Sequence, residues 1–247
     1  MRLAVLADIH GNVAALEAVR ADLDRRYIDR IVNLGDCVSG PLWPRETADL
    51  LIKTQWPTVR GNHDRWVLDT ASKDHGFSDA YASRALDEHH RIWLASLPPR
   101  LDLGDGILGV HGRPDNDNAY LLEDVEDGRL VPARRQSVEA RLPGIVHHVV
   151  LCAHSHIPGV AWLGRNRLVL NPGSVGCPSY EDPTPPAHVS ESGSPYARYA
   201  MLETAGGRIG FEMIAVEYDH RAAAFRAEAN GRPDWAHGLA TGYARTK

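Results

Sequence analysis

Apolar runs of strand length alternate with helical patterns along the first part of the chain. Arg2 to Ala7 is an aliphatic run of strand length, and Arg30 to Leu34 is a second one. Between them, apolar side chains recur at helical spacing over residues 13–23, directly after Asn12, which can cap a helix. Pro44 then opens a second helix that extends to about Lys53. This order predicts a β-loop-α unit that repeats.

A third short β run, Thr58 to Arg60, ends at the polar turn Gly61-Asn-His-Asp64. Residues 66–93 then have a mostly helical pattern, which places His89 and His90 on a solvated face.

The middle of the chain predicts hairpins instead of further β-loop-α units. Strands at 101–103 and 107–110 flank Gly104-Asp-Gly106, and strands at 160–163 and 167–170 flank Gly164-Arg-Asn166. A loop at 115–118, a helix over 134–142 and a strand over 147–152 lie between these hairpins. The pattern therefore departs from pure β-loop-α repeats here.

The last third of the chain predicts a meander and a helix. Residues 199–203 and 208–216 have strand character, and residues 219–229 have helical character. Pro178 to Pro195 contains five prolines, so residues 178–194 are expected to form a loop, for which a functional lid and a disordered segment both stay open. Residues 231–247 are expected to form a loosely held tail.

Bulk properties narrow the classes of protein. A chain of 247 residues fits one domain, so residues 1–247 are predicted to form a single α/β domain. The formal charge of -5 argues against long nucleic acid and anionic membranes as partners. The apolar N-terminal run is too short for a signal peptide, and three cysteines without paired spacing fit a reducing compartment. The expected location is the cytoplasm.

Metal-ligating side chains follow five of the predicted strands directly. Because functional groups gather at the carboxyl ends of strands in open α/β sheets, these side chains can converge. A single aspartate or histidine after a strand is usually a turn, cap or structural residue, but five clusters in the same topological place favour a site. The clusters are Asp8 with His10, Asp36, Asn62 with His63, His111, and His154 with His156.

The clusters supply enough oxygen and nitrogen ligands for two five- or six-coordinate first-row ions. Side chains two apart in extended backbone point the same way. We therefore expect the Asp8 and His10 side chains to face one ion together, and likewise His154 and His156.

These motifs, in this order, resemble the signature of the calcineurin-like metallophosphoesterases. The resemblance rests on Asp8-Ile-His-Gly-Asn12, Gly35-Asp36, Gly61-Asn-His-Asp64, Val110-His-Gly112, Ala153-His-Ser-His156 and Asn171-Pro-Gly-Ser-Val-Gly176. The layout around His111-Gly-Arg-Pro114 is similar to the small bacterial phosphodiesterase branch. The fold that this implies is a four-layer α/β/β/α sandwich of two mixed β-sheets flanked by helices.

The resemblance also implies a ligand set and a mechanism. One metal would be bound by Asp8, His10 and His156, the other by Asn62, His111 and His154, with Asp36 between them. Manganese is expected for both ions, and iron, zinc, nickel, cobalt and magnesium are the alternatives. A metal-bridging hydroxide would attack a small phosphodiester in line, and His63 would donate a proton or stabilise charge.

Asn12 and Arg113 lie next to predicted ligands and are candidates for contact with the phosphate, with turn and cap roles as an equal alternative. Protein phosphatases of this superfamily carry an aspartate and an arginine where this chain has Ser39 and Gly40. This difference argues against a protein phosphatase and leaves His63 without its usual carboxylate partner. Cys37, beside Asp36, could tune the metals or make the site oxidisable.

Several alternatives stay open at this point. Phosphomonoester hydrolysis and dinucleoside polyphosphate hydrolysis remain within the enzyme class, and a small phosphorylated substrate is expected in each case. A metal-containing scaffold without catalytic activity is the rival from another class, but His63 and all seven ligand positions are intact. A nuclease is disfavoured because the chain has no basic stripe. The sequence leaves homo-oligomerisation open.

Overall fold

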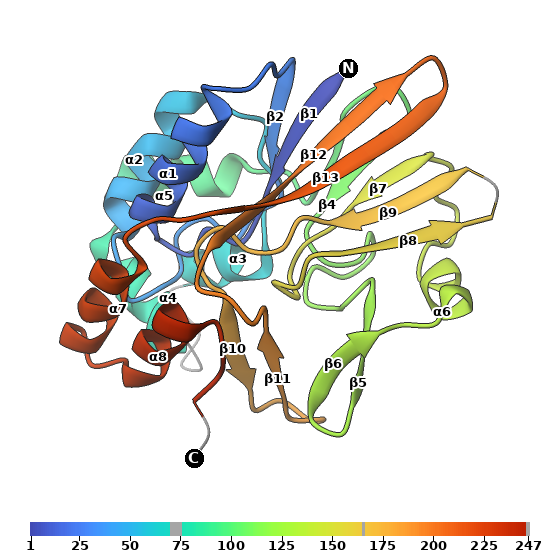
Figure 1. Ribbon diagram of the computed structural model, residues 1–247. Helices are drawn as coiled ribbons and strands as arrows, with labels where there is room; N and C mark the ends of the chain where they lie inside the picture. The colour runs from blue at the N-terminus through green and yellow to red at the C-terminus, as the bar shows by residue number, and fades with distance from the viewer. Residues whose placement is uncertain (70–75, 165, 246–247) are drawn as a thin grey trace.

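A computed structural model describes residues 1–69, 76–164 and 166–245 of the chain. Two mixed sheets lie face to face and helices cover their outer surfaces (Figure 1). The helical prediction over residues 70–75, the turn residue Arg165 and the last two residues of the predicted tail lie outside the described residues.

The first sheet has the strand order β13-β12-β1-β2. Its strands are β1 (Arg2–Leu6), β2 (Arg30–Asn33), β12 (Ala197–Ala205) and β13 (Arg208–Val216). β1 pairs in parallel with β2 and antiparallel with β12. The predicted β-loop-α repeat therefore ends in an antiparallel meander on one edge of the sheet.

The second sheet has the order β3-β4-β7-β9-β8. Its strands are β3 (Arg100–Asp102), β4 (Ile107–Val110), β7 (Val149–Leu151), β8 (Gly159–Leu163) and β9 (Arg167–Asn171). The three central strands β4, β7 and β9 are parallel, and both predicted hairpins form its antiparallel edges.

A third, smaller sheet corrects the prediction of a loop over residues 178–194. It has the order β10-β11-β6-β5 and contains β5 (Glu123–Glu126), β6 (Arg129–Pro132), β10 (Ser179–Asp182) and β11 (His188–Glu191). The five prolines that suggested a loop all lie before, between or after β10 and β11. Since none of them interrupts either strand, the ladder between β10 and β11 keeps its N–H donors.

Eight helices are formed by the described residues. They are α1 (Val13–Leu23), α2 (Pro44–Thr54), α3 (Asn62–Leu68), α4 (Phe77–Ala85), α5 (Glu88–Ser96), α6 (Arg135–Ala140), α7 (His220–Ala229) and α8 (Pro233–Thr241). α1, α2 and α5 lie on one side of the first sheet, and α6 lies beyond the second sheet (Figure 1). The predicted four-layer order is confirmed, with the third sheet added to it.

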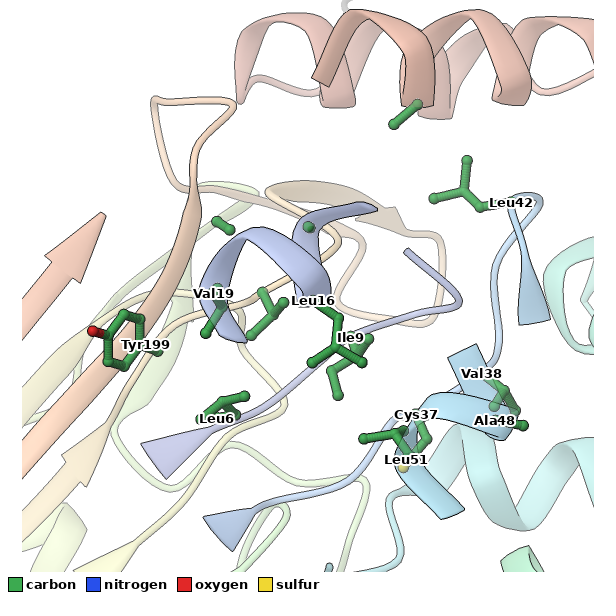
Figure 2. Packing of buried hydrophobic residues seen from close by; sticks show 14 of the residues in the cluster. Leu6, Ile9, Leu16, Val19, Cys37, Val38, Leu42, Ala48, Leu51 and Tyr199 are labelled. Atoms are coloured by element: carbon green, nitrogen blue, oxygen red, sulfur yellow. The ribbon is translucent and has the colours of Figure 1, made fainter. Parts of the chain in front are cut away.

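Apolar residues fill both faces of the central strands, which explains why these strands are uniformly apolar in sequence. In β1, Leu3 and Val5 face the second sheet, whereas Ala4 and Leu6 pack toward the helices. Figure 2 shows this helix-facing layer, in which Leu16 and Val19 of α1 pack near Leu6 and Ile9. Strands buried on both faces lose the polar alternation of a one-sided sheet.

The predicted third strand, Thr58 to Arg60, is reduced to a single parallel bridge between Asn33 and Thr58. Val59 still donates its N–H to the Asn33 carbonyl at 2.9 Å. The ladder stops there because Gly61 is the N-cap of α3 and the backbone turns into that helix. The polar turn thus begins a helix as well as ending an extended segment.

His90 is fully buried, so its predicted place on a solvated face is wrong. Its Nδ1 accepts the N–H of Asp87 at 3.1 Å, and its Nε2 lies 2.9 Å from Asp49 Oδ1. The histidine therefore belongs to the N-terminal capping of α5, and neither ring nitrogen is left for a metal ion. His89 is exposed, as predicted.

The C-terminal residues are not a loosely held tail. α8 begins at Pro233 and ends at Thr241, and it packs against the third sheet. Leu239 is buried, and a Cβ at Gly238 would lie only 2.5 Å from Ser179 Oγ. A close contact of this kind requires the missing side chain of glycine. Across the described residues, no helix has the length and apolar character needed to cross a membrane.

The layer between the two main sheets gives a stability prediction. Leu168 in β9 is fully buried there, and truncation to alanine removes apolar contacts and leaves a cavity. We expect Leu168→Ala to lower the free energy of unfolding by about 2–5 kcal/mol, measured by urea denaturation. Val160→Ala, at a 40% exposed position in the neighbouring strand, should change it by less than about 0.5 kcal/mol. Equal losses in the two variants would contradict this layer order.

Candidate metal centre

The predicted ligands converge at the carboxyl ends of the parallel strands. Asp8 and His10 follow β1, Asp36 follows β2, His111 follows β4, and His154 with His156 follow β7. Asn62 is the first residue of α3. The loops are tied together by backbone hydrogen bonds, including Asp8 N–H to the Gly35 carbonyl at 3.0 Å and His10 N–H to the Asp36 carbonyl at 2.9 Å.

The backbone at these positions is left-handed rather than extended. φ is +54° at Asp8, +51° at His10 and +55° at Asp36, and it is +72° at His154 and +60° at His156. Side chains two residues apart point the same way only in extended backbone, so that rule does not apply to these positions. Non-glycine residues in this conformation cost about 1–3 kcal/mol each, and such residues cluster at functional sites.

Four side chains form the first group of potential ligand atoms. Atoms of Asp8, His10, Asp36 and His156 lie within 4.8 Å of one another, and all four residues are buried. The Nε2 atoms of His10 and His156 are 3.1 Å apart, and Asp8 Oδ1 is 3.7 Å from His156 Nε2. Lone pairs on nitrogen and oxygen atoms this close repel one another unless a cation or a proton lies between them.

A second group shares Asp36 with the first. Atoms of Asp36, His111 and His154 also lie within 4.8 Å of one another. His111 Nε2 is 3.2 Å from Asp36 Oδ2 and 2.9 Å from Asn62 Oδ1, so Asn62 joins this group. Asp8 and His10 lie in one group, as their spacing predicts. The spacing argument is wrong for His154 and His156, which are divided between the two groups in the way that the family resemblance implies.

Backbone carbonyl oxygens orient three of the imidazoles. Nδ1 of His10 lies 2.7 Å from the Ser39 carbonyl, Nδ1 of His111 lies 2.8 Å from the Leu34 carbonyl, and Nδ1 of His156 lies 2.6 Å from the Cys177 carbonyl. A carbonyl only accepts, so each Nδ1 carries a proton and Nε2 is the ring nitrogen that can bind a metal ion. This arrangement fixes the tautomer that a metal ion requires.

Burial decides the charge of several ligands. It lowers the pKa of His10 to about 4 and that of His154 to about 3, so both are neutral at pH 7. Burial would raise the pKa of Asp36, but the charges of His111 and His63 outweigh it and hold that pKa well below its usual range. The shared residue is therefore a carboxylate and two nearby imidazoles are neutral, which are the states that bind metal.

The environment of the Asp8 carboxylate gives separate evidence that these residues fit a metal centre. Both side-chain oxygens of Asp8 are buried, and neither finds a hydrogen-bond partner among the described residues. Burial raises the pKa of this carboxyl well above its ordinary value, with the charge of Asp36 adding to the effect. A buried carboxylate without donors is costly unless a cation compensates it. The mixed nitrogen and oxygen donors suit a first-row divalent ion.

His63 has a carboxylate partner, which corrects the expectation that none is present. Its Nδ1 lies 2.7 Å from Oδ1 of Asp79 in α4, and Ser39 Oγ donates to the same oxygen at 2.7 Å. Ser39 stands at the position where a carboxylate residue was expected, and it donates a hydrogen bond to the Asp79 carboxylate, which takes the place of that residue. Burial lowers the pKa of His63, but the Asp36 charge and Asp79 outweigh it and raise the pKa to about 9. Asp79 follows no recognised motif, so sequence reasoning missed it.

Asp64 organises the loop that carries the shared ligand. Its Oδ2 accepts the N–H of Asp36 at 2.9 Å and that of Gly61 at 3.0 Å, and its Oδ1 accepts the N–H of Cys37 at 2.8 Å. The side chain is fully buried. Its place three residues after the N-cap, which is the capping-box position, was a signal that could have revealed this role.

The structure does not bring Asn12 and Arg113 to the site, so their predicted phosphate contact is not supported. Asn12 Oδ1 accepts the N–H of Ala15 as the cap of α1, and its Nδ2 donates to the Gly176 carbonyl and to Tyr218. Arg113 pairs with Asp115 at the surface. The alternative of cap and turn roles is confirmed for these two residues.

A cavity of about 590 Å³ opens above the two ligand groups. His10, Asp36, Asn62, His63, His154 and His156 line its floor. Its walls include Trp66, Phe77, Tyr180, Arg232 and Trp235. Two of these wall residues come from the segment that was predicted to be a tail, and one comes from the predicted loop.

Strand-end ligands, a shared carboxylate and a flanking histidine define the metallophosphoesterase type of site. The model of the calcineurin-like phosphoesterase superfamily domain matches residues 1–192. The chain therefore belongs to this family of phosphoesterases. The finer placement in the small bacterial branch stays a prediction.

Individual relatives match nearly the whole chain. A solved metallophosphoesterase from Sphaerobacter thermophilus is 27% identical, with a TM-score of 0.76, and 98% of this chain and 99% of that one are covered. The structure of hypothetical protein PH1004 from Pyrococcus horikoshii OT3 is 24% identical, with a TM-score of 0.73 and 99% of each chain covered. The uncharacterised protein MJ0912 from Methanocaldococcus jannaschii is 26% identical over 94% of both chains.

The role of Asp64 can be tested through metal content. Asp64→Asn replaces one acceptor oxygen by an N–H₂ donor that faces backbone N–H groups, so the Asp36 loop should lose its position. We expect a roughly 10- to 100-fold weaker metal affinity, measured by metal titration and elemental analysis. Asp105→Asn, at an exposed turn residue, should bind metal as the natural protein does. Undiminished affinity in Asp64→Asn would remove this positioning role.

Proposed function

We propose that this protein is a phosphodiesterase that hydrolyses small phosphodiesters with two divalent metal ions. The observation that carries the proposal is the pair of ligand groups that share Asp36 on the floor of the cavity, beside His63. Hydrolysis of a phosphoester needs a nucleophilic water, neutralised phosphoryl oxygens and a proton for the leaving group. The residues of this site can supply or hold each of these.

Asp8, His10 and His156 would hold one ion, and Asn62, His111 and His154 the other, with Asp36 between them. Two ions held in this way activate a water molecule and neutralise the phosphoryl oxygens. We propose manganese as the native metal, because carboxylate and amide oxygens are as prominent here as imidazoles and no thiolate belongs to either group.

His63 would protonate the leaving alkoxide. Because Asp79 holds Nδ1, the other ring nitrogen is the one that can transfer a proton to a substrate in the cavity. The His63 side chain is 30% exposed, in contrast to the buried imidazole of His111. An oriented and accessible imidazole of this kind is suited to general acid catalysis.

The charge of the cavity favours a diester over a monoester. Arg232 is the only arginine or lysine among the described lining residues, and Asp234 already pairs with it at 2.6 Å. Asp69, Glu181 and Asp182 add acidic side chains to the walls. A phosphomonoester is close to doubly charged at pH 7, whereas a diester has one charge. The weaker anion meets less repulsion here.

The first test is hydrolysis of bis-p-nitrophenyl phosphate beside p-nitrophenyl phosphate. Protein stripped of metal and reloaded with Mn²⁺ should hydrolyse the diester with the higher kcat/KM, and the stripped protein should be inactive. Asp36→Asn should lose bound metal and activity together, because it weakens a ligand common to both groups. Metal-loaded protein that hydrolyses neither compound would contradict the proposed activity.

The role of His63 needs its own variant. His63→Ala should retain both metal ions but reduce kcat by about 10²- to 10⁴-fold, because it removes the proton donor and none of the ligands. Asp79→Asn should cause a smaller loss, since the imidazole remains but its orientation is weakened. His89→Ala, which removes an exposed histidine of α5, is the matched control and should keep full activity. Unchanged kcat in His63→Ala would exclude it as the proton donor.

A further inference from the structure

Part of the cavity wall is built by residues outside the family-matched segment. The family model ends at residue 192, whereas Arg232 and Trp235 belong to α8 and its N-cap. The Trp235 ring lies 5.9 Å from the His10 ring, at an angle of 71°. A large aromatic surface therefore borders the metal-ligand cluster directly.

Arg232 lies between two aromatic rings. Its guanidinium carbon is 5.4 Å from the centre of the Phe77 ring and 5.7 Å from the centre of the Trp235 ring, which is the range of cation–π contact. Nε and Nη2 of Arg232 donate to Asp234, and Nη1 donates to Ser78 Oγ at 2.8 Å. The three planar groups are thus fixed relative to one another.

The elements around this wall hold it in place. Asn230 donates to the Pro41 carbonyl at 2.8 Å and to Tyr81 at 3.0 Å, which fixes the turn between α7 and α8. Beyond α8, the Ala244 N–H donates to Glu191 in β11 at 2.9 Å. Because the wall is fixed at both ends before a ligand binds, binding loses little conformational entropy of the protein.

We infer that Phe77, Arg232 and Trp235 form a subsite for a planar aromatic group esterified to the phosphate, such as a nucleobase-bearing or aryl ester. The inference rests on the proposed phosphodiesterase activity and specifies its substrate class. Because Asp234 already neutralises Arg232 and the guanidinium contacts both rings, Arg232 holds Phe77 and Trp235 in place, and the rings offer the faces for stacking. Aromatic and guanidinium faces bind planar rings by stacking.

The acidic residues of the same cavity agree with this ligand. Glu181 and Asp182 of β10 line the same cavity, and carboxylates accept hydrogen bonds from ring-bound amino groups. The 590 Å³ volume leaves room for a ring beside a phosphate. An aliphatic ester would leave the aromatic faces exposed to water.

The test compares phenylphosphonate with methylphosphonate, two phosphonates that the enzyme does not hydrolyse, by calorimetric titration of Mn²⁺-loaded protein. The natural protein should bind phenylphosphonate roughly tenfold more tightly. Trp235→Leu should abolish this preference, and Trp235→Phe should restore most of it, because a ring is present again. Trp162→Leu, at a 45% exposed tryptophan of β8, should keep the full preference.

Thermal unfolding of each variant separates a lost ring contact from a lost fold. A natural protein without preference for the phenyl compound, or a Trp235→Leu variant that folds and keeps the preference, would overturn the subsite. Ring-dependent binding without any diester hydrolysis would instead overturn the proposed activity and leave a ring-binding site. Diester hydrolysis that favours aliphatic over aryl esters would retain the activity and reject the subsite.

Discussion

The buried carboxylate of Asp36 is the group on which the arrangement of the site depends. It belongs to both groups of ligand atoms, and its Oδ1 also accepts the His63 N–H at 3.0 Å. One carboxylate therefore fixes the distance between the two groups and the position of the flanking histidine. Its own place is set by Asp64, which accepts hydrogen bonds from the backbone on both sides of the turn. Hydrogen bonds from backbone N–H groups to a carboxylate are stronger than those between neutral groups.

The fold supplies the geometry that these carboxylates need. Parallel strands of two sheets end at one edge, and the loops that follow them take left-handed backbone at five ligand positions. This strain is sustained because β1 and β7 are buried on both faces and tied to β2 and β4 by ladders that a local relaxation would disrupt. The stable core therefore keeps the charged groups at fixed positions, although they repel one another there.

The third sheet and α8 complete the site from outside this core. Tyr180 of β10 packs its ring against His156 at 4.7 Å, and Tyr120 stacks on His154 at 4.9 Å. The hydroxyl groups of these two tyrosines are 2.8 Å apart. The two histidines are therefore supported by tyrosine rings that do not belong to the core strands. β10, which carries Tyr180, also contacts α8, which carries Trp235. Metal ligation and substrate recognition share one supporting layer.

Local patterns in the sequence determined the elements and the chemistry close to them. Uniformly apolar runs predicted the central strands, helical spacing predicted α1 and α7, and polar turns after strands predicted which side chains would gather. These features depend on neighbours along the chain, so they can be read from it. Burial of His90 depends on packing against Asp49 of another helix, and β11 pairs with β6 from a distant part of the chain. These two features were predicted wrongly for that reason.

Only the tertiary structure decided the backbone conformation of the ligands and what surrounds them. Five of the ligand positions have left-handed backbone, a conformation that the residue types alone do not reveal. Asp79 reaches His63 from another helix, and Trp235 reaches His10 from more than two hundred residues away in the chain. Contacts between elements of this kind are set by how the layers pack, whereas the sequence by itself determined which groups were available to meet.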